Sequence, residues 1–219
     1  MEQQVIEKQL PRFDTLTLNS AFTVYLTQGT QNSIKLVGAK VVLDKISMDI
    51  TNYKLILLNN YKEKWLHPNH NKVIVYITTN KLNRIDANAT CSIHTTNTLI
   101  EDYFGLSTAG KLNEATIDVK CNYFYFWNNP PSGGRITLSG SAKKMKLENN
   151  ALMEIDAHDF DCNIVRVANL SKGDVKVIGH DSLIYSITNT GNIYLSGNTA
   201  GTGIINLGES STGKLIIEP

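Results

Sequence analysis

The sequence predicts an all-β protein, a solenoid of short strands wound one upon the next. Asn, Thr, Ile and Leu are abundant, Ala is sparse and the 219 residues include only five Pro, a composition that favours strands and turns over helices. In the second part of the chain, apolar strand centres recur every 8 to 11 residues, which leaves no room for helices between them. Three segments there, residues 134–140, 173–179 and 191–197, share the frame Gly-x-β-x-β-x-Gly. Repeats this short are typical of a solenoid.

An N-terminal β region is expected over residues 13–80, after an N-terminal extension of residues 1–12. Alternating apolar and polar side chains predict short strands over residues 13–18, 22–26, 33–37, 47–50, 55–58 and 73–77. Residues 51–53 suit a tight turn, and residues 39–46 suit a helical turn or two. A polar excursion over residues 59–72 is typical of a long surface loop. We expect these strands to continue into the same body as the rest of the chain.

A repetitive region is expected over residues 81–219. Its later strand centres are Ile136, Leu147, Ile155, Val165, Val175, Ile184, Ile193, Ile204 and Leu215. Each strand buries only two or three aliphatic side chains, so the coils are stable only when they stack. Because Asn and Gly tolerate left-handed backbone, we expect them to turn the corners of the coils. These corners are Asn88, Asn149, Asn150, Asn169, Asn189, Gly173 and Gly191. A sandwich or barrel stays open as an alternative, although the shared glycine frame argues against it.

Charge and hydropathy exclude several classes of partner. The chain has 21 basic and 20 acidic residues, so no electrostatic footprint for nucleic acid or an anionic membrane stands out. Its longest apolar runs, residues 73–77 and 123–127, are far shorter than the roughly 20 residues that cross a bilayer. The first residues contain no apolar leader. The protein is therefore expected to be cytoplasmic, or else its targeting peptide has been removed from this sequence.

Motifs for common chemistries do not occur in the sequence. There is no nucleophile elbow, P-loop, Rossmann glycine fingerprint or HExxH, so no cofactor is expected. The three cysteines, Cys91, Cys121 and Cys162, are too few for a disulfide framework and lack CxxC spacing. At most one disulfide is expected.

Residues 187–197, Ile-Thr-Asn-Thr-Gly-Asn-Ile-Tyr-Leu-Ser-Gly, resemble the closing signature Ile-Ser-Gly-Ser-Gly-x-Ile-x-Tyr-x-Gly of a bacterial family, putative auto-transporter adhesin, head GIN domain. The opening strands at residues 13–29, 34–38, 43–46 and 54–57 follow the order of the same family. The resemblance implies a right-handed parallel β-helix-like fold with short irregular coils. It also implies a cell-envelope or surface location, often behind a signal or lipoprotein peptide, and common occurrence in the Bacteroidetes group. It carries over no catalytic motif.

An aromatic run at residues 121–127 is the most suggestive feature for binding. On a strand its two Phe face one way, whereas Tyr123, Tyr125 and Trp127 face the other. If the second set is exposed, it forms a platform of the kind that stacks on sugar rings or packs against a protein. The alternative is that a neighbouring loop, such as the one that holds Trp65, covers the platform.

An acidic cluster is the strongest sign of catalysis. Asp156 and His158 would share one face of a strand, with Asp159 beside them and Arg166 nearby in sequence. Acids beside a basic group bind calcium or abstract a proton in β-helical polysaccharide lyases. That function predicts that the four residues converge in one groove with pKa values shifted by each other's charges. Outward-facing acids also keep a solenoid soluble, which is the simpler interpretation.

No metal site is expected either, because His67 and His70 flank a proline without an adjacent acid or cysteine. The sequence therefore predicts a non-enzymatic protein of the cell envelope or extracellular space that binds a glycan or protein. The candidate binding residues are Tyr123, Tyr125, Trp127 and Trp65. Two alternatives stay open: a carbohydrate-active enzyme on the same scaffold, and a structural module that self-associates into a homo-oligomer.

Overall fold

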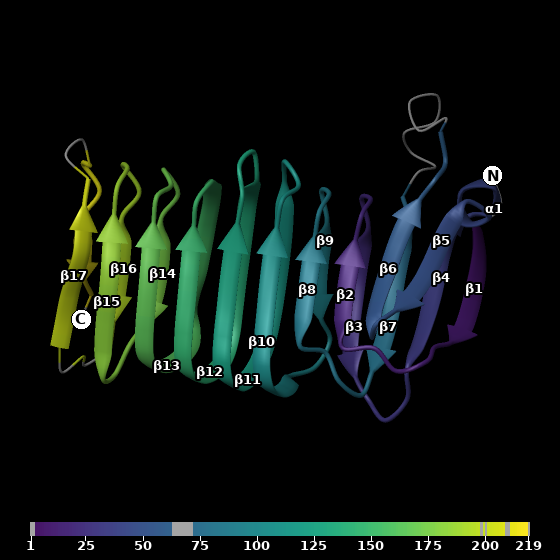
Figure 1. The fold of residues 1–219 in the computed structure, drawn as a ribbon, viewed down its shortest axis with the longest axis horizontal. Coiled ribbons are helices and arrows are strands. Elements are labelled where there is room, and N and C mark those ends of the chain that lie inside the picture. The colour runs from purple at the N-terminus through teal and green to yellow at the C-terminus, as the bar shows by residue number, and fades with distance from the viewer. Residues whose placement is uncertain (1–2, 63–71, 198, 200, 209–210, 219) are drawn as a thin grey trace.

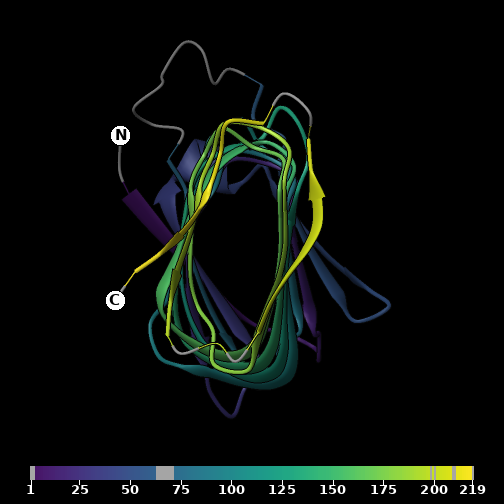
Figure 2. The same ribbon diagram turned by 90° about the vertical axis from the view of Figure 1, so that its left-hand side faces the viewer.

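The computed structural model describes residues 3–62, 72–197, 199, 201–208 and 211–218. Strands make up most of these residues, and they wind into a flattened tube of about six turns with two facing walls (Figures 1 and 2). The prediction of an all-β solenoid is confirmed.

The first wall is a row of parallel strands. In order across the wall they are β6 (Lys54–Asn59), β2 (Thr15–Leu18), β8 (Arg84–Ala87), β10 (Leu99–Thr108), the second halves of β11 (Asn113–Asn128), β12 (Gly133–Asn149) and β13 (Leu152–Asn169), then β15 (Ser182–Ile187) and β17 (Gly201–Leu207). Parallel pairing throughout a wall overturns the sandwich alternative, which needs antiparallel sheets.

The second wall faces the first across the core. Its strands are β4 (Ser33–Ala39), β7 (Ile74–Thr79), β3 (Thr23–Gln28), β9 (Ser92–Thr95), the first halves of β11, β12 and β13, then β14 (Val175–Ile178), β16 (Ile193–Ser196) and β18 (Leu215–Ile217). Strands β11 to β13 are 16 to 18 residues long because each runs around a bend from the second wall into the first.

Antiparallel strands and one short helix close the N-terminal end of the tube. Strand β1 (Gln3–Gln9) lies within the N-terminal extension and pairs with β4, and β5 (Ile46–Thr51) forms a hairpin with β6. Helix α1 (Lys40–Leu43) buries Val42 and Leu43 against the core. Strands β2 and β3 pair with β8 and β9, so the N-terminal strands continue into the same body as predicted.

Side chains from both walls fill the interior of the tube. Residues on successive strands stack in register, as the first wall shows with the inward row Leu16, Ile85, Leu106, Phe126, Leu147 and Val167. Phe104 and Phe124 stack within the core with their centroids 6.2 Å apart. Stacking buries each short strand's few aliphatic side chains, which alone would not hold it in place.

Asparagines at the bend after the first wall have a role that the sequence did not predict. The amide of Asn128 donates to Asn149 Oδ1 at 3.1 Å, and Asn149 donates to Asn169 Oδ1 at 3.2 Å and to the Met153 carbonyl at 2.7 Å. All three asparagines are completely buried. The expectation that the predicted corner asparagines (Asn88, Asn149, Asn150, Asn169 and Asn189) adopt left-handed backbone is wrong, because the described non-glycine residues with positive φ both lie in the β5–β6 hairpin. The amides of Asn128, Asn149 and Asn169 instead satisfy one another between coils.

The repeated glycines mark equivalent bends. The register of β12, β13, β14 and β16 places Gly134, Gly173 and Gly191 at the same bend, with Met153 of β13 in the coil between the first two. Gly134 has φ +120° and a Cβ there would lie 1.9 Å from the Asn113 carbonyl oxygen. At Gly191 a Cβ would lie 2.2 Å from the carbonyl oxygen of Gly173. Glycine is therefore required mainly by the close approach of stacked backbones.

Candidate functional site

The outer surface of the first wall carries a group of aromatic side chains on the neighbouring strands β10 and β11. We call this group the aromatic face; its members are Tyr103, Tyr123, Tyr125 and Trp127. Along β11, Phe124 and Phe126 point inward and are completely buried, whereas the alternate residues point outward and are half-buried. The face is thus the outward half of a strand whose inward half anchors it in the core.

The rings of the aromatic face differ in what they contact. Tyr103 and Tyr123 stack with their centroids 5.7 Å apart, and the Tyr103 ring lies beside Gly105, where a Cβ would be 3.1 Å from Tyr103 Oη. Trp127 makes no side-chain hydrogen bond or ring contact with any described residue. Its indole N–H and ring are therefore available to a ligand. Tyr103 was missed by the sequence analysis, although it pairs in register with Tyr123.

A polar arrangement fixes Tyr125. Its hydroxyl donates to Glu148 Oε2 at 2.8 Å, while Lys146 Nζ lies 5.5 Å from its ring centroid and 2.5 Å from Glu148 Oε1. Burial and the hydrogen bond to Glu148 raise the pKa of Tyr125 well above its usual value. Burial alone would raise the pKa of Glu148, but the hydrogen bonds from Lys146 and Tyr125 outweigh it and lower that pKa. Tyr125 therefore keeps its proton beside an ionised Glu148.

The polar excursion that was expected to form a surface loop falls largely on residues 63–71. Trp65, His67 and His70 are among them, so all three lie outside the residues that the structure describes. The assignment of Trp65 to the binding site therefore stays a prediction.

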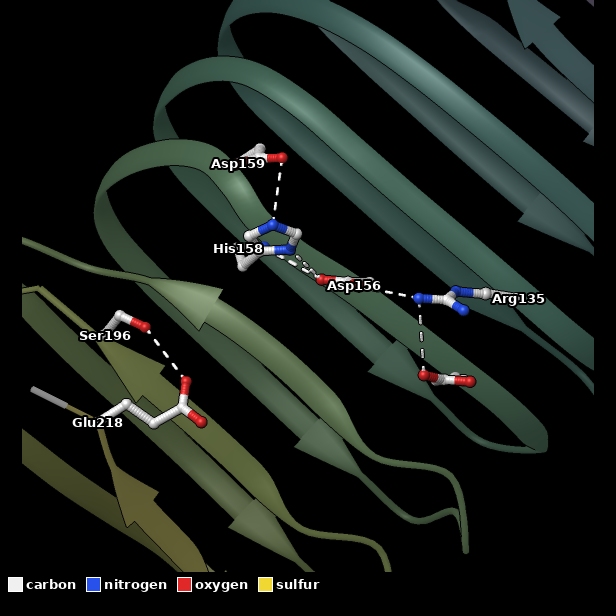
Figure 3. Close-up of polar contacts among 7 residues, drawn as sticks. Arg135, Asp156, His158, Asp159, Ser196 and Glu218 are labelled. Atoms are coloured by element: carbon white, nitrogen blue, oxygen red, sulfur yellow. Dashed lines mark hydrogen bonds and ion pairs between the residues drawn. The ribbon is translucent and has the colours of Figure 1, made fainter.

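The acidic cluster lies on the outer side of the second wall. His158 Nδ1 lies 2.5 Å from Asp156 Oδ1 and His158 Nε2 lies 3.2 Å from Asp159 Oδ2, while Arg135 Nη2 lies 3.0 Å from Asp156 Oδ2 (Figure 3). Arg166 is not part of this cluster. It lies on the first wall, where its charge acts on Glu148.

The prediction that Asp156, His158, Asp159 and Arg166 converge is therefore wrong. Strand β13 bends between Asp156 and Arg166, so the two residues occupy different walls of the tube. Arg135, which is 21 residues before Asp156 in sequence, takes the place expected for Arg166 because it lies on the neighbouring strand β12.

The pKa values of the cluster follow from its ion pairs. Burial alone would raise the pKa of Asp156, but hydrogen bonds from His158 and Arg135 outweigh burial and lower it below its usual range. The hydrogen bond to Asp156, together with the charge of that carboxylate, raises the pKa of His158. A stabilising ion pair lowers the pKa of its acid and raises the pKa of its base.

We expect the ion pair to stabilise the fold in a limited pH window. The contribution of Asp156 is lost as pH falls through its lowered folded pKa, and that of His158 is lost as pH rises through its raised folded pKa. The melting temperature of wild type should therefore exceed that of His158→Gln most between about pH 4 and 6.5. The difference should vanish at a pH above the pKa of His158 in both the unfolded and the folded state. Thermal unfolding across pH measures this.

A double-mutant cycle controls for other effects of the His158 substitution. In an Asp156→Asn background, the pH-dependent effect of His158→Gln on the melting temperature should shrink to the smaller part that Asp159 carries. The same pH-dependent gap in both backgrounds would contradict the assignment to this pair.

A second group of stacked rings lies on the outer side of the second wall. The Tyr25 ring stacks on Tyr76 at 5.2 Å and on His94 at 5.4 Å, and Lys35 lies 6.0 Å from the Tyr76 centroid. This group was not predicted from the sequence. The apolar and polar alternation around Tyr25 could have indicated its outward position, because its neighbours in β3 point into the core. These rings cover one another's faces, whereas Trp127 has no ring partner among the described residues.

The three cysteines are free thiols. Cys121 and Cys162 share a row, but Ala142 lies between them, so they are two strand spacings or about 9.6 Å apart, too far for a disulfide. Burial raises the pKa of Cys91 and Cys121 to about 11 and that of Cys162 to about 12. Such thiols are poor nucleophiles near neutral pH.

Within the described ranges, no helix combines the length and the apolar character that spanning a bilayer requires. The same residues contain no group of three or more His, Cys, Asp and Glu side chains that could hold a metal ion.

Taken together, the two walls of parallel strands and the filled interior define the chain as a β-solenoid. Residues 12–199 match the family described as "Putative auto-transporter adhesin, head GIN domain", and the chain belongs to that family. The resemblance seen in residues 187–197 and in the opening strands is thereby confirmed.

Solved structures share the fold at low sequence identity. A "putative adhesin" from Bacteroides fragilis NCTC 9343 is 17% identical with a TM-score of 0.87, covering 99% of this chain and 97% of that chain. A "putative adhesin" and a "putative lipid binding protein", both from Parabacteroides distasonis ATCC 8503, are 12% and 13% identical, each with a TM-score of 0.68 and the same coverage. No curated protein matches the sequence.

Proposed function

We propose that this chain is a non-enzymatic binding module of the bacterial cell envelope or surface, and that its aromatic face binds glycans. The observation that carries the proposal is Trp127, a half-buried indole whose ring and N–H have no partner among the described side chains. Trp and Tyr supply large contact area at a low cost in conformational entropy. Membership of an adhesin family supports a location where such contacts are made.

The arrangement suits a sugar chain. Tyr123, Tyr125 and Trp127 occupy successive outward positions of one strand, so their side chains project from the same side of the wall. The apolar faces of pyranose rings pack on such side chains, while hydroxyls bond to polar groups around them. Glu148, the register partner of Trp127 on β12, supplies acceptor oxygens beside it.

The acids near the aromatic face support binding more than catalysis. Asp86 is held by Arg84 at 2.7 Å and by the Ser107 hydroxyl at 2.7 Å. Glu148 is held by Lys146 and Tyr125. A glycoside hydrolase needs two carboxyl groups that face each other across the scissile bond, one of them protonated. Carboxylates engaged by cations are poor candidates for that acid role.

We expect Trp127→Ala to weaken glycan binding at least about tenfold, because a central Trp is the side chain that most often dominates a binding surface. Isothermal titration calorimetry against the polysaccharide selected from a glycan array measures the loss. The matched control is Tyr25→Ala on the second wall, which should leave the affinity within about twofold of wild type.

Both variants need an unchanged melting temperature for the comparison to hold. Equal affinity of Trp127→Ala and wild type would contradict the proposed site, and a glycan array without any binding would contradict the proposed function. Sedimentation tests the self-association alternative. Dimers of wild type that Trp127→Ala converts to monomers would favour that alternative instead.

A further inference from the structure

A row of cations crosses the first wall at the level of Tyr125. The register of the parallel strands places one outward residue of each strand in this row, which we call the cationic row. From β6 to β13 its members are Lys54, Thr15, Arg84, Gly105, Tyr125, Lys146 and Arg166. The row contains four cations and no acid. The adjacent outward row through Tyr103 and Tyr123 continues into Lys144 on β12 and is also free of acids as far as Ser182.

The acids on the other side of the cationic row are already engaged. Asp86 is paired with Arg84, and Glu148 is paired with Lys146. Lys144 and Arg166 are exposed and have no ion pair with any described residue. The wall around Tyr125 therefore keeps a local positive charge, although the whole chain has a formal net charge of only +1.

The spacing of the row matches a polymer better than a single small ligand. Neighbouring parallel strands are about 4.8 Å apart, close to the length of one sugar residue in an extended chain. A glycan that crosses the strands along the row of Tyr103 and Tyr123 would meet both rings and then Lys144. One that follows the cationic row would meet Tyr125, then Lys146 and Arg166. Lys144 would then meet a group carried by the sugar next to Tyr123, and Arg166 would meet a group carried by the sugar two strands beyond Tyr125.

We propose that the aromatic face selects anionic glycans, polysaccharides that carry a carboxylate or sulfate on successive sugars, and that Lys144 and Arg166 pair with these anions. The proposal rests on the glycan-binding function proposed above and names its ligand class. Guanidinium groups pair with carboxylates and sulfates through two parallel hydrogen bonds, and ammonium groups act as point charges. The stacking rings supply contact area, and the cations supply the selectivity.

The test compares polygalacturonate, which carries carboxylates, and dextran sulfate with neutral dextran, by affinity electrophoresis and calorimetry. Wild type should bind an anionic polymer at least about fivefold more tightly than dextran. The double variant Lys144→Gln/Arg166→Gln should weaken anionic binding by about fivefold to tenfold. Its matched control is Lys176→Gln/Lys214→Gln, which removes the same charge from the second wall and should change binding less than about twofold.

Salt and Trp127→Ala separate the two proposals. Anionic binding should weaken steeply toward about 1 M NaCl, where charges are screened beyond about 3 Å. Equal binding of dextran and the anionic polymers, without salt dependence, would overturn the selectivity and leave the glycan-binding function in place. Equal losses in both double variants would also overturn it. Binding of none of the three polymers would overturn the glycan-binding function itself. Preference for one anionic polymer over the other assigns the anion.

Discussion

A Gly134→Ala variant is expected to lose more than about 4 kcal/mol of unfolding free energy, the largest effect of any single substitution considered for this chain. Gly134 has φ +120°, a conformation that L side chains rarely adopt, and an added Cβ would lie 1.9 Å from the Asn113 carbonyl oxygen. That oxygen belongs to the backbone of the neighbouring coil, so the clash is relieved only by separating β11 from β12. Urea unfolding followed by circular dichroism measures the change.

Gly203→Ala in β17 is the matched control. A Cβ at Gly203 would find only one neighbouring atom, Ile184 Cγ1, at 3.9 Å, so the substitution should be neutral or slightly stabilising. If Gly134→Ala unfolded at the same urea concentration as wild type, the close stacking of the coils at this bend would be wrong.

The second large effect is expected for Asn149→Ala, at about 3 to 5 kcal/mol. Asn128, Asn149 and Asn169 form a chain of side-chain hydrogen bonds between coils, which we call the asparagine ladder. The substitution deletes three buried hydrogen bonds, two with the other asparagines of this ladder and one with the Met153 carbonyl. The Asn128 amide N–H would lose its acceptor in a completely buried site, and Asn169 Oδ1 would keep only the bond from the Ser171 backbone N–H. Thermal and urea unfolding both report the loss.

Asn163→Ala controls for the general cost of removing an asparagine. Asn163 is exposed and makes a single long hydrogen bond of 3.3 Å to Asp181, so its loss should cost less than about 0.5 kcal/mol. Equal destabilisation by the two variants would contradict a structural role for the ladder.

The ladder begins at Asn128, directly after Trp127, so Asn149→Ala should also weaken glycan binding by loosening the end of the aromatic face.

Some features of the candidate site followed from local pattern. Alternation along residues 121–127 was enough to separate the buried Phe124 and Phe126 from the outward aromatic residues, because side chains of a strand point alternately to its two faces. The glycines of the repeated frame were placed at equivalent bends for a related reason. A repeat that occurs at the same position of each coil returns to the same place in the stack.

Other features depended on how the coils stack. Arg166 was grouped with Asp156 because it follows only ten residues later in sequence, yet β13 bends between them and carries them to opposite walls. Arg135 and Tyr103 were missed because their partners lie about 20 residues away in sequence and one strand away in space. The asparagine ladder was missed for the same reason, since a backbone argument was applied to side chains that bond across coils.

The sequence by itself determined that the chain is an all-β solenoid of this adhesin family, because short-range alternation and repeated glycines report directly on strand faces and bends. The tertiary structure alone decided which side chains meet, including the cationic row, the pairing of Arg135 with Asp156 and the asparagine ladder. Those contacts are set by the register between coils. The register depends on the exact length of every turn, and a pattern of variable spacing does not specify that length.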